Sequence, residues 1–135
     1  MNGYHVDLEK KSEINENFRE VLFTSPHFQL VVMSLEPAED IGLEMHIETD
    51  QFFRVEEGEG KAVLDGEEIS LEEGSAIVIP AGTEHNVINT SSRKALKMYT
   101  LYSPPQHPNG VIHKTKAEAE AYESEQFQPQ PAAPP

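Results

Sequence analysis

The sequence predicts an all-β fold, a small antiparallel barrel or sandwich, and two observations lead to that prediction. Between Phe18 and about Tyr102, short segments rich in β-branched and aromatic residues follow one another at regular spacing. Turn sequences separate them, among them Glu-Gly-Glu-Gly, Asp-Gly and Pro-Ala-Gly. So many short strands in 135 residues favour a closed or two-layered sheet, which leaves few strand edges exposed.

Nine segments are expected to form strands, and one connection between them is especially clear. The hairpin around Asp65-Gly66 is the clearest of the expected connections, because this dipeptide favours a type I′ turn between two β-rich arms. The strand-like segments are 19–24, 27–35, 42–48, 51–57, 60–66, 67–71, 75–80, 85–90 and 95–102.

Four zones describe the chain. Residues 1–17 are a polar N-terminal lead-in that could add an edge strand, and 18–113 form the β-barrel. Residues 114–126 predict a short C-terminal helix, because Ala, Glu and Lys are dense there and Gly and Pro are absent. Residues 127–135 are Pro-rich and are expected to be a disordered tail.

Composition narrows the function. The chain has 24 acidic and 10 basic residues and a net charge of −14, so we expect no nucleic-acid partner and no anionic membrane surface. The absence of cysteine excludes disulfides, a thiolate nucleophile and Cys-based metal sites. With no secretory signal and no apolar run long enough to span a bilayer, a cytoplasmic location is expected.

Two segments carry the chemistry. The second runs from Gly74 to Asn89 and reads G-x5-P-x-G-x2-H-x3-N, with His85 at the head of a strand after a tight turn. The first runs from Pro37 to Gly60 and contains Glu44-x-His46-x4-Gln51 followed by Gly58.

These two segments resemble the two signatures of the cupin superfamily. The second matches at every fixed position, whereas the first has Glu44 where the family has His and Gln51 where it has Glu. The resemblance implies a single-domain, type-2 cupin of jelly-roll architecture, similar to mannose-6-phosphate-isomerase-like and uronate-processing small cupins. It also implies a metal-ligand set of Glu44, His46, Gln51 and His85, and a homodimer.

The residues themselves support a metal site. Glu44 and His46 are two apart on an expected strand and so point to one face. Two imidazoles and a carboxylate are a donor set for Fe(II), Mn(II), Ni(II) or Zn(II). Glu48 shares the face of His46 and is the alternative carboxylate, and Gln51 could instead hydrogen-bond a water or substrate. A cavity that holds no metal is a further alternative.

Roles for the remaining polar residues stay open at this point. Glu48 and Tyr102 are candidate proton-transfer residues. His107 and His113 lie in a long stretch that could be an active-site lid or a surface strap.

Three functions fit this pattern. The first is a metal-dependent isomerase or lyase that acts on a small sugar or sugar-acid derivative. The second is an Fe(II)-dependent dioxygenase, and the third is a non-catalytic module that binds a small ligand. Because one fold hosts many chemistries, fold alone does not choose among them.

Overall fold

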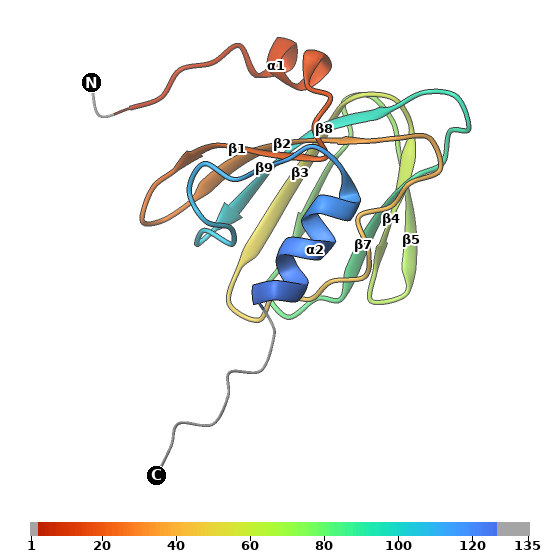
Figure 1. Cartoon of the computed structure of the whole chain (residues 1–135). Coiled ribbons are helices and arrows are strands. Elements are labelled where there is room, and N and C mark those ends of the chain that lie inside the picture. The colour runs from red at the N-terminus through yellow and green to blue at the C-terminus, as the bar shows by residue number, and fades with distance from the viewer. Residues whose placement is uncertain (1–2, 127–135) are drawn as a thin grey trace.

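Two antiparallel sheets face each other in the computed structural model, which describes residues 3–126 (Figure 1). The larger sheet has the order β6-β3-β8-β2-β1-β9, and the smaller has the order β5-β4-β7. The elements are α1 (Leu8–Ile14), β1 (Arg19–Thr24), β2 (Gln29–Leu35), β3 (Asp50–Glu57), β4 (Gly60–Leu64), β5 (Glu67–Leu71), β6 (Ala76–Ile79), β7 (His85–Asn89), β8 (Leu96–Ser103), β9 (Ile112–His113) and α2 (Lys116–Gln126).

The predicted all-β jelly-roll with a C-terminal helix is confirmed by this architecture. The expected hairpin is present as well, since Leu64 pairs with Glu67 and the turn residues Asp65 and Gly66 both have positive φ, at 47° and 84°. Two positive φ angles are the signature of a type I′ turn. The tail expected at 127–135 lies outside the described residues.

Two segments differ from the sequence-based prediction. The 42–48 segment is not a regular strand: it makes one isolated bridge, from Glu44 to His85, and a second bridge joins Asp40, just before it, to Ile88. Gly42, at φ 107°, interrupts the extended backbone where the segment begins. Within residues 3–17 the lead-in forms the helix α1 and no edge strand, and the Asp7 side chain caps the helix by accepting a hydrogen bond from the Lys10 N–H.

Side chains alternate across β8 and show which face is the core. Met98, Thr100 and Tyr102 are buried, whereas Tyr99 and Leu101 are partly exposed. Phe53 on the neighbouring β3 is 2% exposed and belongs to the hydrophobic core, so its role is core packing.

The central strand β2 is buried on both faces. Val31 and Met33 face the core, while Val32 and Ser34 point the other way and are buried as well. Figure 1 shows α1 running along the outside of the six-stranded sheet near β2 and β8, and α1 contacts both strands. The helix that the sequence did not predict therefore covers part of the outer face.

Helix α2 packs at the opening between the sheets (Figure 1). Ala119 is buried in the core, and Lys116 forms an ion pair with Asp40. Within residues 3–126, no helix is long and apolar enough to cross a membrane.

Candidate metal centre

A backbone bridge joins the two signature segments. The Glu44 N–H donates to the His85 carbonyl, and the His85 N–H donates to the Glu44 carbonyl, both at 2.8 Å. The Gly82 N–H donates to the His46 carbonyl, also at 2.8 Å. Because these bonds fix the 44–46 segment against the start of β7, residues far apart in the sequence present their side chains to one point.

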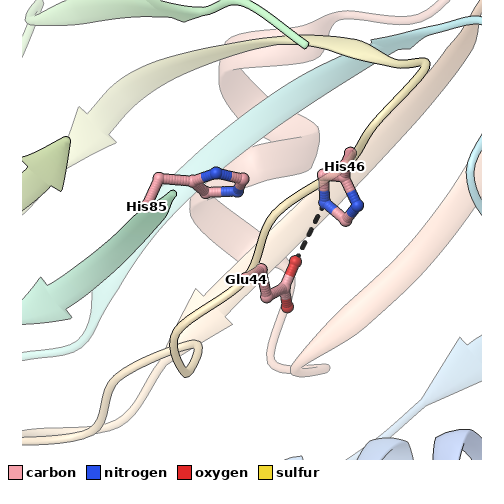
Figure 2. Close-up of side chains that lie close together, drawn as sticks. All are labelled: Glu44, His46 and His85. Carbon is pink, nitrogen blue, oxygen red and sulfur yellow. Dashed lines mark ion pairs between the residues drawn. The ribbon is translucent and has the colours of Figure 1, made fainter. Parts of the chain in front are cut away.

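Three side chains converge at that point (Figure 2). One donor atom each from Glu44, His46 and His85 lies within 4.8 Å of the others, a group that could hold a metal ion. His85 is 3% exposed, and the side chains of His46 and Glu44 are 11% and 23% exposed. Glu44, and not Glu48, joins the two histidines, since Glu48 is exposed to solvent.

Hydrogen bonding fixes the tautomer of His85. Its Nδ1 lies 2.9 Å from the Thr83 carbonyl oxygen, which can only accept, so Nδ1 carries the proton. Nε2 is then the unprotonated nitrogen, and it is buried with no hydrogen-bond partner within residues 3–126. A metal-ligating histidine typically has this arrangement, with one nitrogen donating to a carbonyl and the other free for the ion.

His46 Nε2 and Glu44 Oε2 lie 3.0 Å apart (Figure 2). The contact lacks hydrogen-bond geometry, because His46 Nε2 is buried without a hydrogen-bond partner in the described structure. Two donors that each lie about 2.1 Å from one ion, at right angles, are about 3 Å apart. The spacing and the unsatisfied nitrogen therefore fit a shared metal ion.

Gln51 has an orientation that frees its carbonyl oxygen. Its Nε2 donates to Thr100 Oγ1 at 3.1 Å, and its Oε1 is buried with no hydrogen-bond partner among residues 3–126. Gln51 pairs with Tyr102 across β3 and β8, and the Tyr102 ring contacts the His46 ring edge-on. An amide oxygen held in this way could complete a metal site or accept a hydrogen bond from a bound molecule.

A pocket of about 600 Å³ opens beside the cluster, within the usual size range for small-molecule sites. It lies between the 44–46 segment, the 106–108 segment and α2. Its lining residues are Glu44, Met45, His46, Gln106, His107, Pro108, Tyr122 and Glu123.

Tyr102 and His107 lie next to the cluster. The two rings meet edge-on with centroids 5.1 Å apart, and Tyr102 contacts His46 in the same way at 6.0 Å. Burial raises the pKa of the Tyr102 phenol. Burial also lowers the pKa of His107 to about 3, so this imidazole is neutral at physiological pH.

Hydrogen bonds hold the long 104–111 connection against the barrel. Gln29 Nε2 donates to the His107 carbonyl at 2.6 Å, and the His107 N–H donates to Gln29 Oε1 at 3.0 Å. His107 therefore lines the pocket from a fixed segment. His113 lies apart from the cluster on β9, where its ring packs on Tyr122.

Sequence reasoning missed two charged residues near the pocket, Arg19 and Glu123. Arg19 is 1% exposed and forms an ion pair with Glu123 of α2 at 3.4 Å. The alternation of side chains along β1 could have indicated that Arg19 is buried, because it shares a strand face with Val21, where an apolar residue is expected. Nothing in the sequence indicated that Glu123, on an acidic helix, would reach this cation.

The chain is similar to known proteins in both sequence and structure. The family model described as Cupin domain matches residues 31–102. The uncharacterized protein YrkC of Bacillus subtilis (strain 168) is 46% identical over 124 residues, which are 87% of this chain and 66% of YrkC. The crystal structure of BH2720 from Bacillus halodurans has a TM-score of 0.86 at 44% identity, covering 89% of this chain and 95% of that one.

A more distant relative is named for its activity. Quercetin 2,3-dioxygenase of Bacillus subtilis (strain 168) is 33% identical over 89 residues, which are 66% of this chain and 26% of that enzyme. The chain therefore spans about a quarter of the length of the dioxygenase and about two thirds of YrkC.

Proposed function

The chain belongs to the cupin family, and we propose that it is a metal-dependent enzyme of isomerase or lyase type. Its substrate is a small sugar or sugar-acid derivative. Glu44, His46, Gln51 and His85 hold a divalent transition metal, one of Zn, Mn, Fe or Ni.

One observation carries this proposal: two buried imidazole nitrogens without hydrogen-bond partners face a carboxylate beside an open pocket. Burying a polar atom without a hydrogen-bond or metal partner destabilises the fold. The presence of two such nitrogens at one site therefore favours a binding role for them. Nitrogen and oxygen donors without thiolate suit the metals named above.

The metal, when bound, would act as a Lewis acid on a carbonyl or a hydroxyl of the substrate. The protein's own residues hold the two histidines in place. The Thr83 carbonyl keeps the His85 tautomer, and the Gly82 N–H anchors the His46 backbone. Of the two candidate proton-transfer residues, Tyr102 contacts His46 while Glu48 is exposed to solvent, which favours Tyr102.

The test is proton exchange with solvent. Purified protein loaded with each metal is incubated in D2O with a panel of sugars and sugar acids, and deuterium at carbon is followed by NMR. We expect metal-dependent incorporation that His85→Ala abolishes and that His27→Ala, at an exposed site, retains. Exchange that is indifferent to chelation and to His85→Ala would contradict the proposal.

A second candidate, an Fe(II)-dependent dioxygenase, has its own support. Two histidines and one carboxylate are the donor set of many non-haem iron oxygenases, and quercetin 2,3-dioxygenase is a relative over part of its length. Oxygen uptake by the Fe(II)-loaded protein, measured with an electrode on the same panel, separates the two functions, since isomerisation consumes no O2.

A non-catalytic ligand-binding role is the remaining reading, and binding without turnover or oxygen uptake would favour it. The homodimer expected from the resemblance stays a prediction, which multi-angle light scattering tests. The cytoplasmic location likewise stays a prediction, which fractionation of the source cells tests.

A further inference from the structure

A buried cation, Arg19, contacts Glu123, one of the residues that line the pocket. Arg19 projects from β1 in the same cross-strand row as Met33 and Met98, so it enters the core face of the six-stranded sheet. Its side chain is 2% exposed, although charged groups are rarely this buried unless they are well paired.

The pairing of Arg19 is incomplete. Its Nη1 donates to Glu123 Oε1 at 3.4 Å. Charge-assisted hydrogen bonds are usually shorter, about 2.7–2.9 Å. Its Nε is buried and has no hydrogen-bond partner in the part of the chain that the structure describes. The Phe18 ring lies 5.3 Å from the guanidinium carbon and offers no acceptor oxygen. The Tyr102 hydroxyl is a neutral neighbour: burial raises its pKa, and the charge and hydrogen bond of Arg19 act in the opposite direction. A planar guanidinium can bind a carboxylate through two parallel hydrogen bonds, and Glu123 uses only one of them.

Glu123 contacts both this cation and the pocket. It lines the cavity together with Glu44 and His46, and its side chain is 40% exposed. Moving Glu123 away would therefore open Arg19 to the same cavity that borders the candidate metal cluster. Burial, and to a smaller extent the Arg19 charge, lowers the pKa of His107, another lining residue, so the guanidinium lies within electrostatic reach of the pocket.

We propose that Arg19 binds a carboxylate group of the pocket's ligand, and that Glu123 occupies this position until the ligand displaces it. This inference rests on the proposed function only in its choice of pocket, and it narrows the substrate class to carboxylate-bearing molecules. A protein of net charge −14 repels anions at long range, so a buried cation beside the pocket favours binding of an anionic group there.

The test observes the Arg19 Nε–H signal directly by ¹⁵N NMR, assigned by its loss in Arg19→Lys. The full chain is titrated with sodium acetate, with acetamide as the neutral isostere and with inorganic phosphate, at ionic strength matched by sodium chloride. We expect acetate to shift the signal with saturation and acetamide to leave it unchanged. A response to phosphate but not to acetate would overturn the assignment to a carboxylate.

Glu123→Gln removes the internal competitor. If the Glu123-free state of the wild type is populated at about 10%, acetate should bind the variant about tenfold more tightly. Glu120→Gln is the matched control, because it removes the same charge from an exposed position on α2 and should leave acetate affinity unchanged.

Two results would overturn the proposal. One is an Arg19 signal that acetate leaves unmoved in both the wild type and Glu123→Gln. The other is equal acetate affinity in Glu123→Gln and the wild type, which would make the ion pair a tether for α2. His46→Ala separates this test from the metal proposal, since it should lose metal and keep the acetate response.

Discussion

Ala38 has a backbone conformation that L-residues rarely adopt, with φ at 64° in the turn that precedes the 44–46 segment. Such a conformation costs about 1–2 kcal/mol for a residue with a Cβ. The Ala38 side chain is exposed and its N–H donates to the Ser91 carbonyl, so glycine would keep the turn. After the entropy that glycine loses on folding, Ala38→Gly should stabilise the protein by about 0.5–1 kcal/mol.

The measurement is the midpoint of thermal unfolding, which should rise by about 3 °C. Ala81→Gly is the control, because Ala81 is an exposed turn residue outside the positive-φ positions of the described chain. Equal shifts in the two variants would contradict the assignment of strain to Ala38.

Gln51 gives a second prediction at this scale. Gln51→Glu replaces a neutral oxygen donor by a charged one, and Thr100 can donate its hydroxyl proton to the new carboxylate. If Gln51 is a ligand, the affinity for Mn(II) should rise on the order of tenfold, about 1.4 kcal/mol. Isothermal titration calorimetry measures it, with Asn109→Asp as the control, because that change adds the same charge at an exposed position. An unchanged affinity would remove Gln51 from the ligand set.

The resemblance to the two cupin signatures implied that Glu44, His46 and His85 meet, whereas two-residue alternation alone left Glu48 as an alternative to Glu44. Glu44 and His46 share a face by that rule, and the turn through Gly82 leads directly to His85. The role of Arg19 was not predictable in this way. Its environment depends on Glu123, 104 residues away, and that contact exists only once α2 has packed.

At the scale of elements, the attachment of α2 depends on Asp40. Its carboxylate accepts hydrogen bonds from Lys116 at the start of the helix and from Asn86 on β7. The Asn86 and Lys116 hydrogen bonds together lower the pKa of Asp40 from its ordinary 3.8. The stabilisation is therefore complete above the ordinary pKa and is lost as pH falls through the lowered one.

Asp40→Asn should reduce the stability by less than about 1 kcal/mol at pH 7, because the pair is partly exposed. The difference in melting temperature between the wild type and Asp40→Asn should hold from neutral pH to about 5 and shrink below about 4. Glu120→Gln removes the more distant carboxylate near Lys116 and should have a smaller effect. A difference that grows on acidification would contradict this account.

The elements that the sequence predicted are those with local signals. Asp65-Gly66 specified its hairpin, and the Ala/Glu/Lys run specified α2. Helix α1 has only seven residues with no apolar stripe, and its stability comes from capping and from packing on β2 and β8. The 42–48 segment has strand-like alternation, but Gly42 and the single bridge at Glu44 leave it irregular.

At the scale of the whole molecule, the charge of −14 sets the response to salt. Repulsion among carboxylates opposes the compact state, and salt screens it over a Debye length of about 10 Å at 0.1 M. The melting temperature should therefore rise by a few degrees between low salt and 0.5 M sodium chloride. Chloride is the appropriate salt, since sulfate strengthens apolar burial in any protein. A fall in melting temperature would show that attractive pairs outweigh the repulsion.

Elemental analysis of the purified, tag-free protein decides whether Glu44, His46 and His85 bind a metal ion. The wild type should hold about one transition-metal ion per chain, and the His46→Ala/His85→Ala double variant should hold none. His5→Ala/His27→Ala, at two exposed positions, should retain the metal. A wild type that stays metal-free after addition of Fe, Mn, Ni and Zn, or a double variant that retains the metal, would contradict the account.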